Sequence, residues 1–142
     1  MTLFLALVAL LAPAPTASAR SAADFESAVH TATNAVRVDH DLRKLRKRAC
    51  VDRFANRQAK RMAEKDDAFH QALKPILDKC GLGLVGENVA WGHTKAGTLL
   101  KAWMDSPDHR ANILKPDYRQ LGVGARKSDS GVWYVAQVFG RK

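Results

Sequence analysis

The sequence has few cysteines and few aromatic residues, and it lacks a long apolar run. Its 142 residues include two cysteines, and phenylalanine, tryptophan and tyrosine together make up 7%. Two cysteines permit one intramolecular disulfide, which excludes a densely disulfide-bonded scaffold. The most apolar stretch lies in the first nineteen residues, where prolines interrupt it. It is shorter than the roughly 20 apolar residues that span a bilayer, so we do not expect it to be a membrane-spanning helix.

These first nineteen residues also lack any charged side chain. Leu3 to Ala12 has the length of the apolar core of a secretory signal peptide, and Ala17-Ser18-Ala19 fits the small-x-small cleavage pattern, although the usual positively charged start is absent. We predict a signal peptide over residues 1–19, cleavage before Arg20 and one secreted, extracellular domain over residues 20–142. A membrane anchor is the alternative; after cleavage no transmembrane span is expected.

Export changes the expected state of the two cysteines. Cys50 and Cys80 would fold in an oxidising compartment, where thiols pair. We therefore predict a Cys50–Cys80 disulfide, for which the chain-entropy model gives a stabilisation of about 3.5 kcal/mol. Two buried free thiols are the alternative.

Acidic residues are too few to balance the basic ones, and the formal net charge is +9. Residues 37–61 hold ten Lys or Arg and three Asp. The densest part is a basic face formed by Arg43, Lys44, Arg46, Lys47 and Arg48. Such a face can bind anionic lipid or an acidic wall polymer, or can simply be solvated. Nucleic acid is not expected, because no aromatic side chains interleave the run to stack on bases.

Hydrophobic spacing predicts helices followed by strands, an α+β fold. Apolar residues at helical spacing run from Phe25 to Val36, and a cleaner amphipathic pattern covers Ala49 to Glu64. The remaining predicted elements are an extended segment from Leu84 to Val89, a helix capped by Thr94 and ending before Ser106, a short helix from Pro107 to about Leu114, and two antiparallel strands, 120–127 and 132–140, joined by Ser128–Gly131.

The polar residues that could carry chemistry are His70, Glu87, His93 and His109. In an extended segment Glu87 and Val89 face one side and Asn88 faces the other. A buried carboxylate then needs a metal, an opposite charge, a hydrogen-bond donor or its own proton. Two imidazoles and a carboxylate suit zinc, although their spacing alone does not distinguish a zinc site from polar hydrogen bonding in the core.

Ser106 and the three tryptophans can be explained by structural roles as well as by a role in a site. A Ser106–His109 dyad is conceivable, but we expect the Ser106 hydroxyl to cap the short helix instead. Trp103 and Trp133 fall at core positions of a helix and a strand. Trp91, beside Gly92 and His93, is the tryptophan expected to line a groove.

Four motifs resemble the CAP superfamily of cysteine-rich secretory proteins, antigen 5 and plant pathogenesis-related proteins, which contain the SCP domain. They are "GENVA" at residues 86–90, "WMDSPDHRANIL" at 103–114, "LGVG" at 121–124 and "WYVAQVFG" at 133–140. The short bacterial secreted branch is the most similar. The resemblance implies an α-β-α sandwich, with a small antiparallel sheet between helical layers and a surface cleft.

The resemblance also implies a site in that cleft. Two histidines and up to two glutamates can hold a divalent metal in the family, and His70, Glu87 and His109 match three of these positions. Ser106 occupies the position where many eukaryotic members have the second glutamate, so the negative charge of this site is reduced. His93 has no counterpart in the family pattern, although Trp91, His93 and Ser106 are candidates to line the cleft. Asp41 replaces a common glycine, which Asp tolerates because it adopts left-handed conformations more readily than most residues.

These features favour a non-catalytic, monomeric binding module; its ligand would be a lipid, a wall polymer or another protein. The cleft is predicted to be able to hold a divalent metal, zinc by preference. The first alternative is a metal-assisted, protease-like hydrolase, in which the ion activates water. The second is an electrostatic binder of anionic cell-surface polymer or lipid through the basic face.

Overall fold

The computed structural model describes residues 21–142, and the predicted signal peptide and its cleavage site lie outside the described residues. Nine elements follow one another along this part of the chain. They are α1 (Ala22–Asp39), β1 (Arg46–Lys47), α2 (Ala49–Lys65), α3 (Lys74–Cys80), β2 (Leu84–Trp91), α4 (Ala96–Asp105), α5 (Pro107–Ile113), β3 (Gln120–Lys127) and β4 (Trp133–Arg141).

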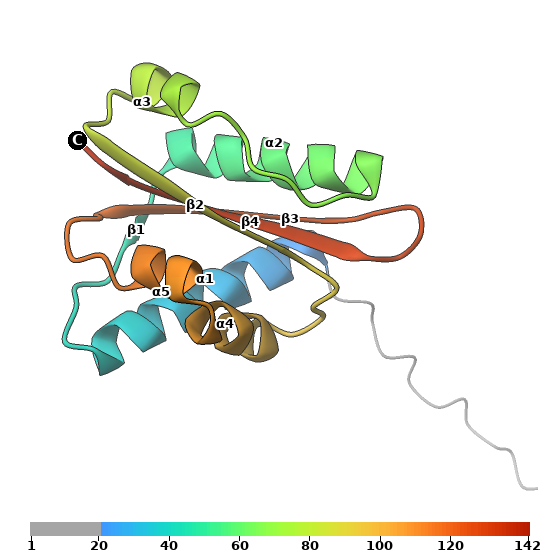
Figure 1. The fold of residues 1–142 in the computed structure, drawn as a ribbon, viewed down its shortest axis with the longest axis horizontal. Coiled ribbons are helices and arrows are strands. Elements are labelled where there is room, and N and C mark those ends of the chain that lie inside the picture. The colour runs from blue at the N-terminus through green and yellow to red at the C-terminus, as the bar shows by residue number, and fades with distance from the viewer. Residues whose placement is uncertain (1–20) are drawn as a thin grey trace, which may run out of the picture.

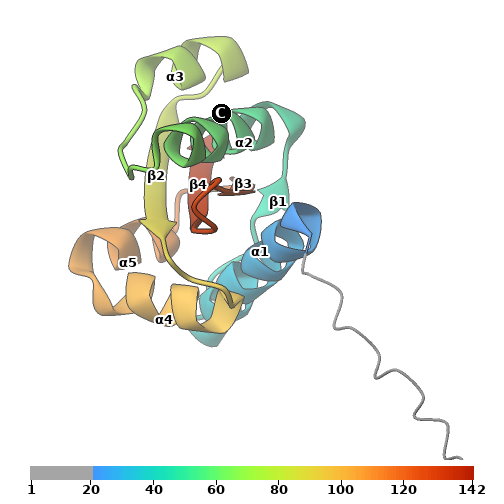
Figure 2. The ribbon, with the colours of Figure 1, turned by 90° about the vertical axis from the view of Figure 1, so that its right-hand side faces the viewer.

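A four-stranded sheet lies between two helical layers, which confirms the predicted α-β-α sandwich. Helices α2 and α3 cover one face of the sheet, and α1, α4 and α5 cover the other (Figures 1 and 2). The strand order is β1-β3-β4-β2, so β1 and β2 are the two edges. β4 pairs antiparallel with β3, which confirms the predicted hairpin, and antiparallel with β2, as the family resemblance implied. The short β1, which was not predicted, pairs parallel with β3.

The predicted helices form because their apolar stripes face the sheet. α2 buries Val51, Phe54, Ala59 and Met62 while its arginines point outward, and its bounds differ by one residue from the prediction. α4 ends at Asp105 as predicted, but its N-cap is Lys95 rather than Thr94, and no side chain caps it. Asp41 has a φ of 56°, so it adopts the left-handed conformation anticipated for it.

Glycines in β3 bring α2 unusually close to the sheet. A Cβ added at Gly122 or Gly124 would collide with the backbone of Asp52 or of Ala55. Because β1 is short, much of the adjacent edge of β3 has no neighbouring strand, and helix side chains form hydrogen bonds with its backbone groups instead. Asp52 and Asn56 bond to the N–H and C=O of Val123, at 3.3 Å each, and Glu26 accepts from the N–H of Ala125 at 3.0 Å. The helices thereby protect a strand edge that would otherwise be exposed.

A disulfide joins Cys50, at the start of α2, to Cys80, at the end of α3, as predicted. It lies beside a small core of Val51, Ile76, Leu82 and Val138. The bond therefore fixes α3 against α2 at one end of the layer. Within residues 21–142 no helix has both the length and the apolar character needed to cross a membrane.

We expect removal of this disulfide to destabilise the fold. The bond closes a loop with a sequence separation of 30 residues, so Cys50→Ser/Cys80→Ser should lower the free energy of unfolding by about 3.5 kcal/mol and the melting temperature by roughly 10 °C. Calorimetry of the oxidised protein, the reduced protein and the double variant measures this effect. Equal melting temperatures in all three would show that the bond contributes nothing to stability.

Candidate functional site

Glu87 is a buried carboxylate on the edge strand β2. Its side chain is 1% exposed, and it points toward the loop that joins α2 to α3. Oε1 accepts from the backbone N–H of Gln71 at 3.1 Å and lies 2.8 Å from Nδ1 of His70, and Oε2 accepts from Nε2 of Gln71 at 2.6 Å. The carboxylate therefore has the hydrogen-bond partners that a buried charge requires.

The structure thus brings His70 and Glu87 together, and the imidazole lies on the outer side of the carboxylate. The side chain of His70 is 60% exposed, so one ring edge contacts the carboxylate while the rest faces solvent. Val89 packs on the same side of β2, beside Met62 and Ala63 of α2, which confirms the predicted alternation along this strand.

Asn88 faces the opposite helical layer, where it holds α5 in place. Its Nδ2 donates to the carbonyl of His109 at 3.1 Å and to Oε1 of Gln137 at 3.2 Å. Asn112 of α5 donates back to the carbonyl of Glu87 and to Oδ1 of Asn88, at 3.1 and 2.9 Å. These bonds replace the backbone partner that an edge strand lacks, and they fix α5 and His109 against β2.

Ser106 does not cap α5 with its hydroxyl, contrary to the prediction. It occupies the N-cap position, but no side-chain capping bond forms. Its Oγ instead lies 2.9 Å from Nδ1 of His109. The side chain of Ser106 therefore orients the imidazole rather than the helix, and the ring of His109 lies 6.5 Å from that of the buried Trp103.

The pKa of His109 is lowered from its ordinary value. Burial in the cleft is the largest cause, and the charge of the nearby His70 acts in the same direction, while Asp108 opposes both. The neutral imidazole is consequently the favoured form in the folded protein at neutral pH.

A cavity of about 270 Å³ opens beside His109. It is lined by Val89, Ala90, Trp91, His93, Ala102, Trp103, Ser106 and His109. Trp91 is 61% exposed, whereas Trp103 is 2% exposed and donates from its indole N–H to the carbonyl of Val89 at 3.2 Å. The three predicted cleft-lining residues therefore share one cavity with His109, while Glu87 and His70 are not among its lining residues.

The predicted zinc ligands do not all converge on one point. Among residues 21–142 no three His, Cys, Asp or Glu side chains are grouped so as to hold a metal ion. Glu87 has both oxygens in hydrogen bonds and serves as the acceptor behind His70, a common arrangement around metal-binding histidines. His70 and His109 supply two imidazoles, whereas a catalytic zinc usually has three protein ligands. The described residues thus show no complete set of metal ligands, and zinc binding stays a prediction.

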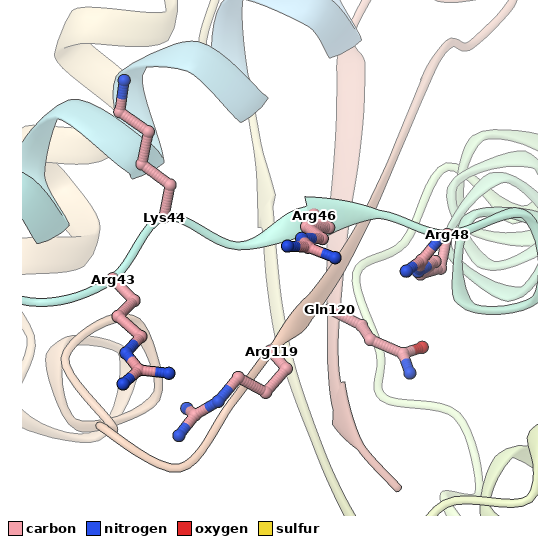
Figure 3. A pocket seen from close by; sticks show the side chains of 6 residues that line it. All are labelled: Arg43, Lys44, Arg46, Arg48, Arg119 and Gln120. Carbon is pink, nitrogen blue, oxygen red and sulfur yellow. The ribbon is translucent and has the colours of Figure 1, made fainter.

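The basic face lies at the other edge of the sheet. Arg43, Lys44, Arg46 and Arg48 line a second cavity together with Arg119 and Gln120 (Figure 3). Lys47 instead pairs with Asp52 at 3.3 Å and lines a different hollow, beside α1. The structure thus separates the five predicted residues into two environments.

Sequence reasoning missed three residues of these sites. Gln71 was not singled out, although its place next to His70 could have suggested a second donor to Glu87. Asn112 lies one helical turn after His109 on the same predicted short helix. This spacing places the two side chains on one face of that helix, which could have suggested that both face the sheet. Arg119 is distant in sequence from the basic run, and only the pairing of β1 with β3 brings it there.

The lowered pKa of His109 predicts a pH dependence of stability. The unfolded chain binds this proton more tightly than the folded one, so the free energy of unfolding should fall as pH drops below about 6.5. His109→Gln should lessen that fall without abolishing it, because burial also lowers the pKa of His30. Denaturant titrations at pH 7.5 and 5 measure the difference, with the exposed His40→Gln as control. Equal pH effects in wild type and His109→Gln would contradict the assignment.

Comparison with known proteins agrees with the motifs and the fold. A family model described as the cysteine-rich secretory protein family, CAP, matches residues 30–139. The uncharacterized protein YkwD of Bacillus subtilis is 30% identical over 125 residues, which cover 83% of this chain and 48% of YkwD. The chain thus spans about half of this relative, and it covers 29% of the second matching B. subtilis protein, the membrane protein YlbC.

Two solved structures have the same fold. An extracellular protein of Bacillus anthracis that contains an SCP domain is 27% identical with a TM-score of 0.71, over 82% of this chain and 40% of that one. An outer surface protein of Borrelia burgdorferi is 17% identical with a TM-score of 0.79, over 87% of this chain and 96% of that one. From the family match, the motifs and the shared architecture, the chain belongs to the cysteine-rich secretory protein (CAP) family.

Proposed function

We propose that this chain is a non-catalytic extracellular binding module, whose cleft takes an apolar group with a hydrogen-bonding end. The observation that carries the proposal is the cavity between Trp91 and α4. Its walls are apolar at Val89, Ala90 and Ala102, while Ser106 and His109 lie among them as polar groups. A mainly apolar pocket with a few fixed polar groups is the usual form of a ligand site.

The exposure of Trp91 supports this proposal. Val38 and Trp91 are the only large apolar side chains that are exposed in residues 21–142. Exposing an indole to water forgoes the burial energy of a large apolar surface, and tryptophan is among the residue types most enriched in binding hot spots. The ligand source would be a lipid, a wall polymer or a protein.

The geometry of Glu87 argues against its acting as a hydrolytic base. A water-activating base needs a free lone pair near the reacting water. Both oxygens of Glu87 are engaged by His70 and Gln71, and the Glu87 side chain is almost fully buried. An extracellular location is consistent with the B. anthracis relative, which is an extracellular protein.

Binding of an apolar ligand should depend on Trp91. With decanoate and an uncharged hydrophobic tripeptide as probes, we expect one of them to bind by calorimetry, and Trp91→Ala to weaken that binding by about tenfold or more. Val38→Ala is the matched control, because it truncates the other exposed apolar side chain, which lies on α1 and does not line this cavity. No binding of either probe, or equal losses in both variants, would refute the cleft as the ligand site.

Zinc binding is tested separately, because the metal is not needed for the apolar ligand. If the two imidazoles act together, zinc should bind at one weak site that both His70→Ala and His109→Ala abolish. His93→Ala is the control, since His93 lines the cavity without belonging to the predicted ligand set. Calorimetric titration with zinc chloride measures this, and unchanged binding in either His70→Ala or His109→Ala would remove the metal from the proposal.

A further inference from the structure

A second cavity, of about 570 Å³, is lined almost entirely by cations. Its residues are Arg43, Lys44, Arg46, Arg48, Arg119 and Gln120, with no carboxylate among them (Figure 3). It lies at the β1 edge of the sheet, whereas the cleft with Trp91 lies at the β2 edge. This cavity is therefore distinct from the site of the proposed function.

The fold, not the sequence run alone, assembles the cavity. β1 pairs parallel with β3, which sets Arg46 opposite Gln120, and the N–H of Arg46 donates to the carbonyl of Arg119 at 3.0 Å. The guanidinium of Arg119 is held by the carbonyls of Pro116 and Tyr118, at 2.5 and 2.8 Å. In Figure 3 the side chains of Arg43 and Arg119 extend to the same side of the strand.

Behind these groups lies a fully buried arginine. Arg37 donates to the carbonyl of Arg43 at 2.9 Å, and to those of Ile113 and Lys115 at 2.7 and 3.0 Å. It therefore ties the basic segment to the turn that precedes Arg119. Its Nη2 is buried without a hydrogen-bond partner, so the charge of this guanidinium is only partly compensated inside the protein.

The cations of this cavity lack carboxylate partners. In the described part of the chain, no ion pair involves Arg43, Lys44, Arg46, Arg48 or Arg119, while the neighbouring Lys47 does have a carboxylate partner. Helix α2 also begins next to Arg48 without a side-chain cap, although Asp52 in its first turn offsets part of the positive charge at this helix end. Five like charges repel one another, and an anionic ligand would relieve that repulsion.

We propose that this cavity binds successive phosphates of an extracellular phosphodiester polymer. Arginine guanidinium groups suit phosphate oxygens because they donate two parallel hydrogen bonds. The lining contains no aromatic side chain on which nucleic-acid bases would stack. It also contains no large apolar side chain that would insert into a bilayer, since neither Val38 nor Trp91 belongs to it.

The test compares two charge-matched double variants of the disulfide-bonded protein. Arg43→Gln/Arg46→Gln removes two charges from the cavity, and Arg53→Gln/Arg126→Gln removes two exposed arginines outside it. The probe is poly(glycerol phosphate), titrated at several salt concentrations. The wild-type protein should bind with an affinity that falls steeply as the salt concentration rises. In the cavity variant the plot of log K against log salt should be shallower, with the magnitude of its negative slope smaller by about two. In the control variant the magnitude of this slope should decrease by much less.

Three results would overturn the proposal. Equal changes in both variants would mean that the polymer responds to net charge rather than to this cavity, and an unchanged slope in the cavity variant would mean that the two arginines do not contact phosphate. Phosphatidylglycerol vesicles present a similar phosphodiester on a lipid. Vesicle binding that exceeds polymer binding and depends on Arg43 and Arg46 would assign the cavity to a membrane surface instead. Circular dichroism of both variants verifies folding.

Discussion

The close packing of α2 on β3 is the contact on which both candidate sites depend. At Gly122 and Gly124 the helix backbone occupies the space that a side chain would need. Asp52 and Asn56 then reach the backbone of Val123 and fix the position of the helix along the strand. The start of α2 is thereby placed beside β1, and the loop after its end is placed over β2. A larger residue at Gly122 or Gly124 would push α2 away from the sheet and so displace both ends of this helix.

The edge strand β2 connects the two helical layers at the candidate site, because alternate side chains of this strand contact opposite layers. Glu87 contacts His70 and Gln71 in the α2–α3 loop, whereas Asn88 contacts α5 and Gln137. Gln137 in turn donates to Thr33 of α1 at 2.6 Å, so a buried chain of amides and a hydroxyl links three elements. A fully satisfied polar network of this kind favours one arrangement of the elements over looser alternatives. The position of His109 follows from that arrangement.

The two edges of the sheet have different electrostatic characters, which is why they suit different ligands. At the β2 edge, burial and the nearby His70 lower the pKa of His109, and the cavity beside Trp91 is mainly apolar. At the β1 edge, arginines from two segments gather without carboxylate partners in the described residues. One small domain can thus present an apolar cleft and a polyanion site without competition between them.

Local sequence determined most of the helices and strands, and tertiary structure decided the sites. Apolar spacing in α2, the Ser106-Pro107 boundary and the paired apolar strands were sufficient to predict α+β architecture, since these signals act within a few residues. The family motifs added the layer order and the expectation that His70, Glu87 and His109 lie in one cleft, of which the structure shows the contact of His70 with Glu87. The two-residue β1 was too short to leave a pattern, so the meeting of Arg46 with Arg119 was not predictable. For Ser106 the sequence left two partners open, and the structure selects His109 rather than the helix N-terminus. Periodicity identifies which face a residue occupies, but the partner of a polar side chain depends on elements that are distant in sequence and meet only in the folded protein.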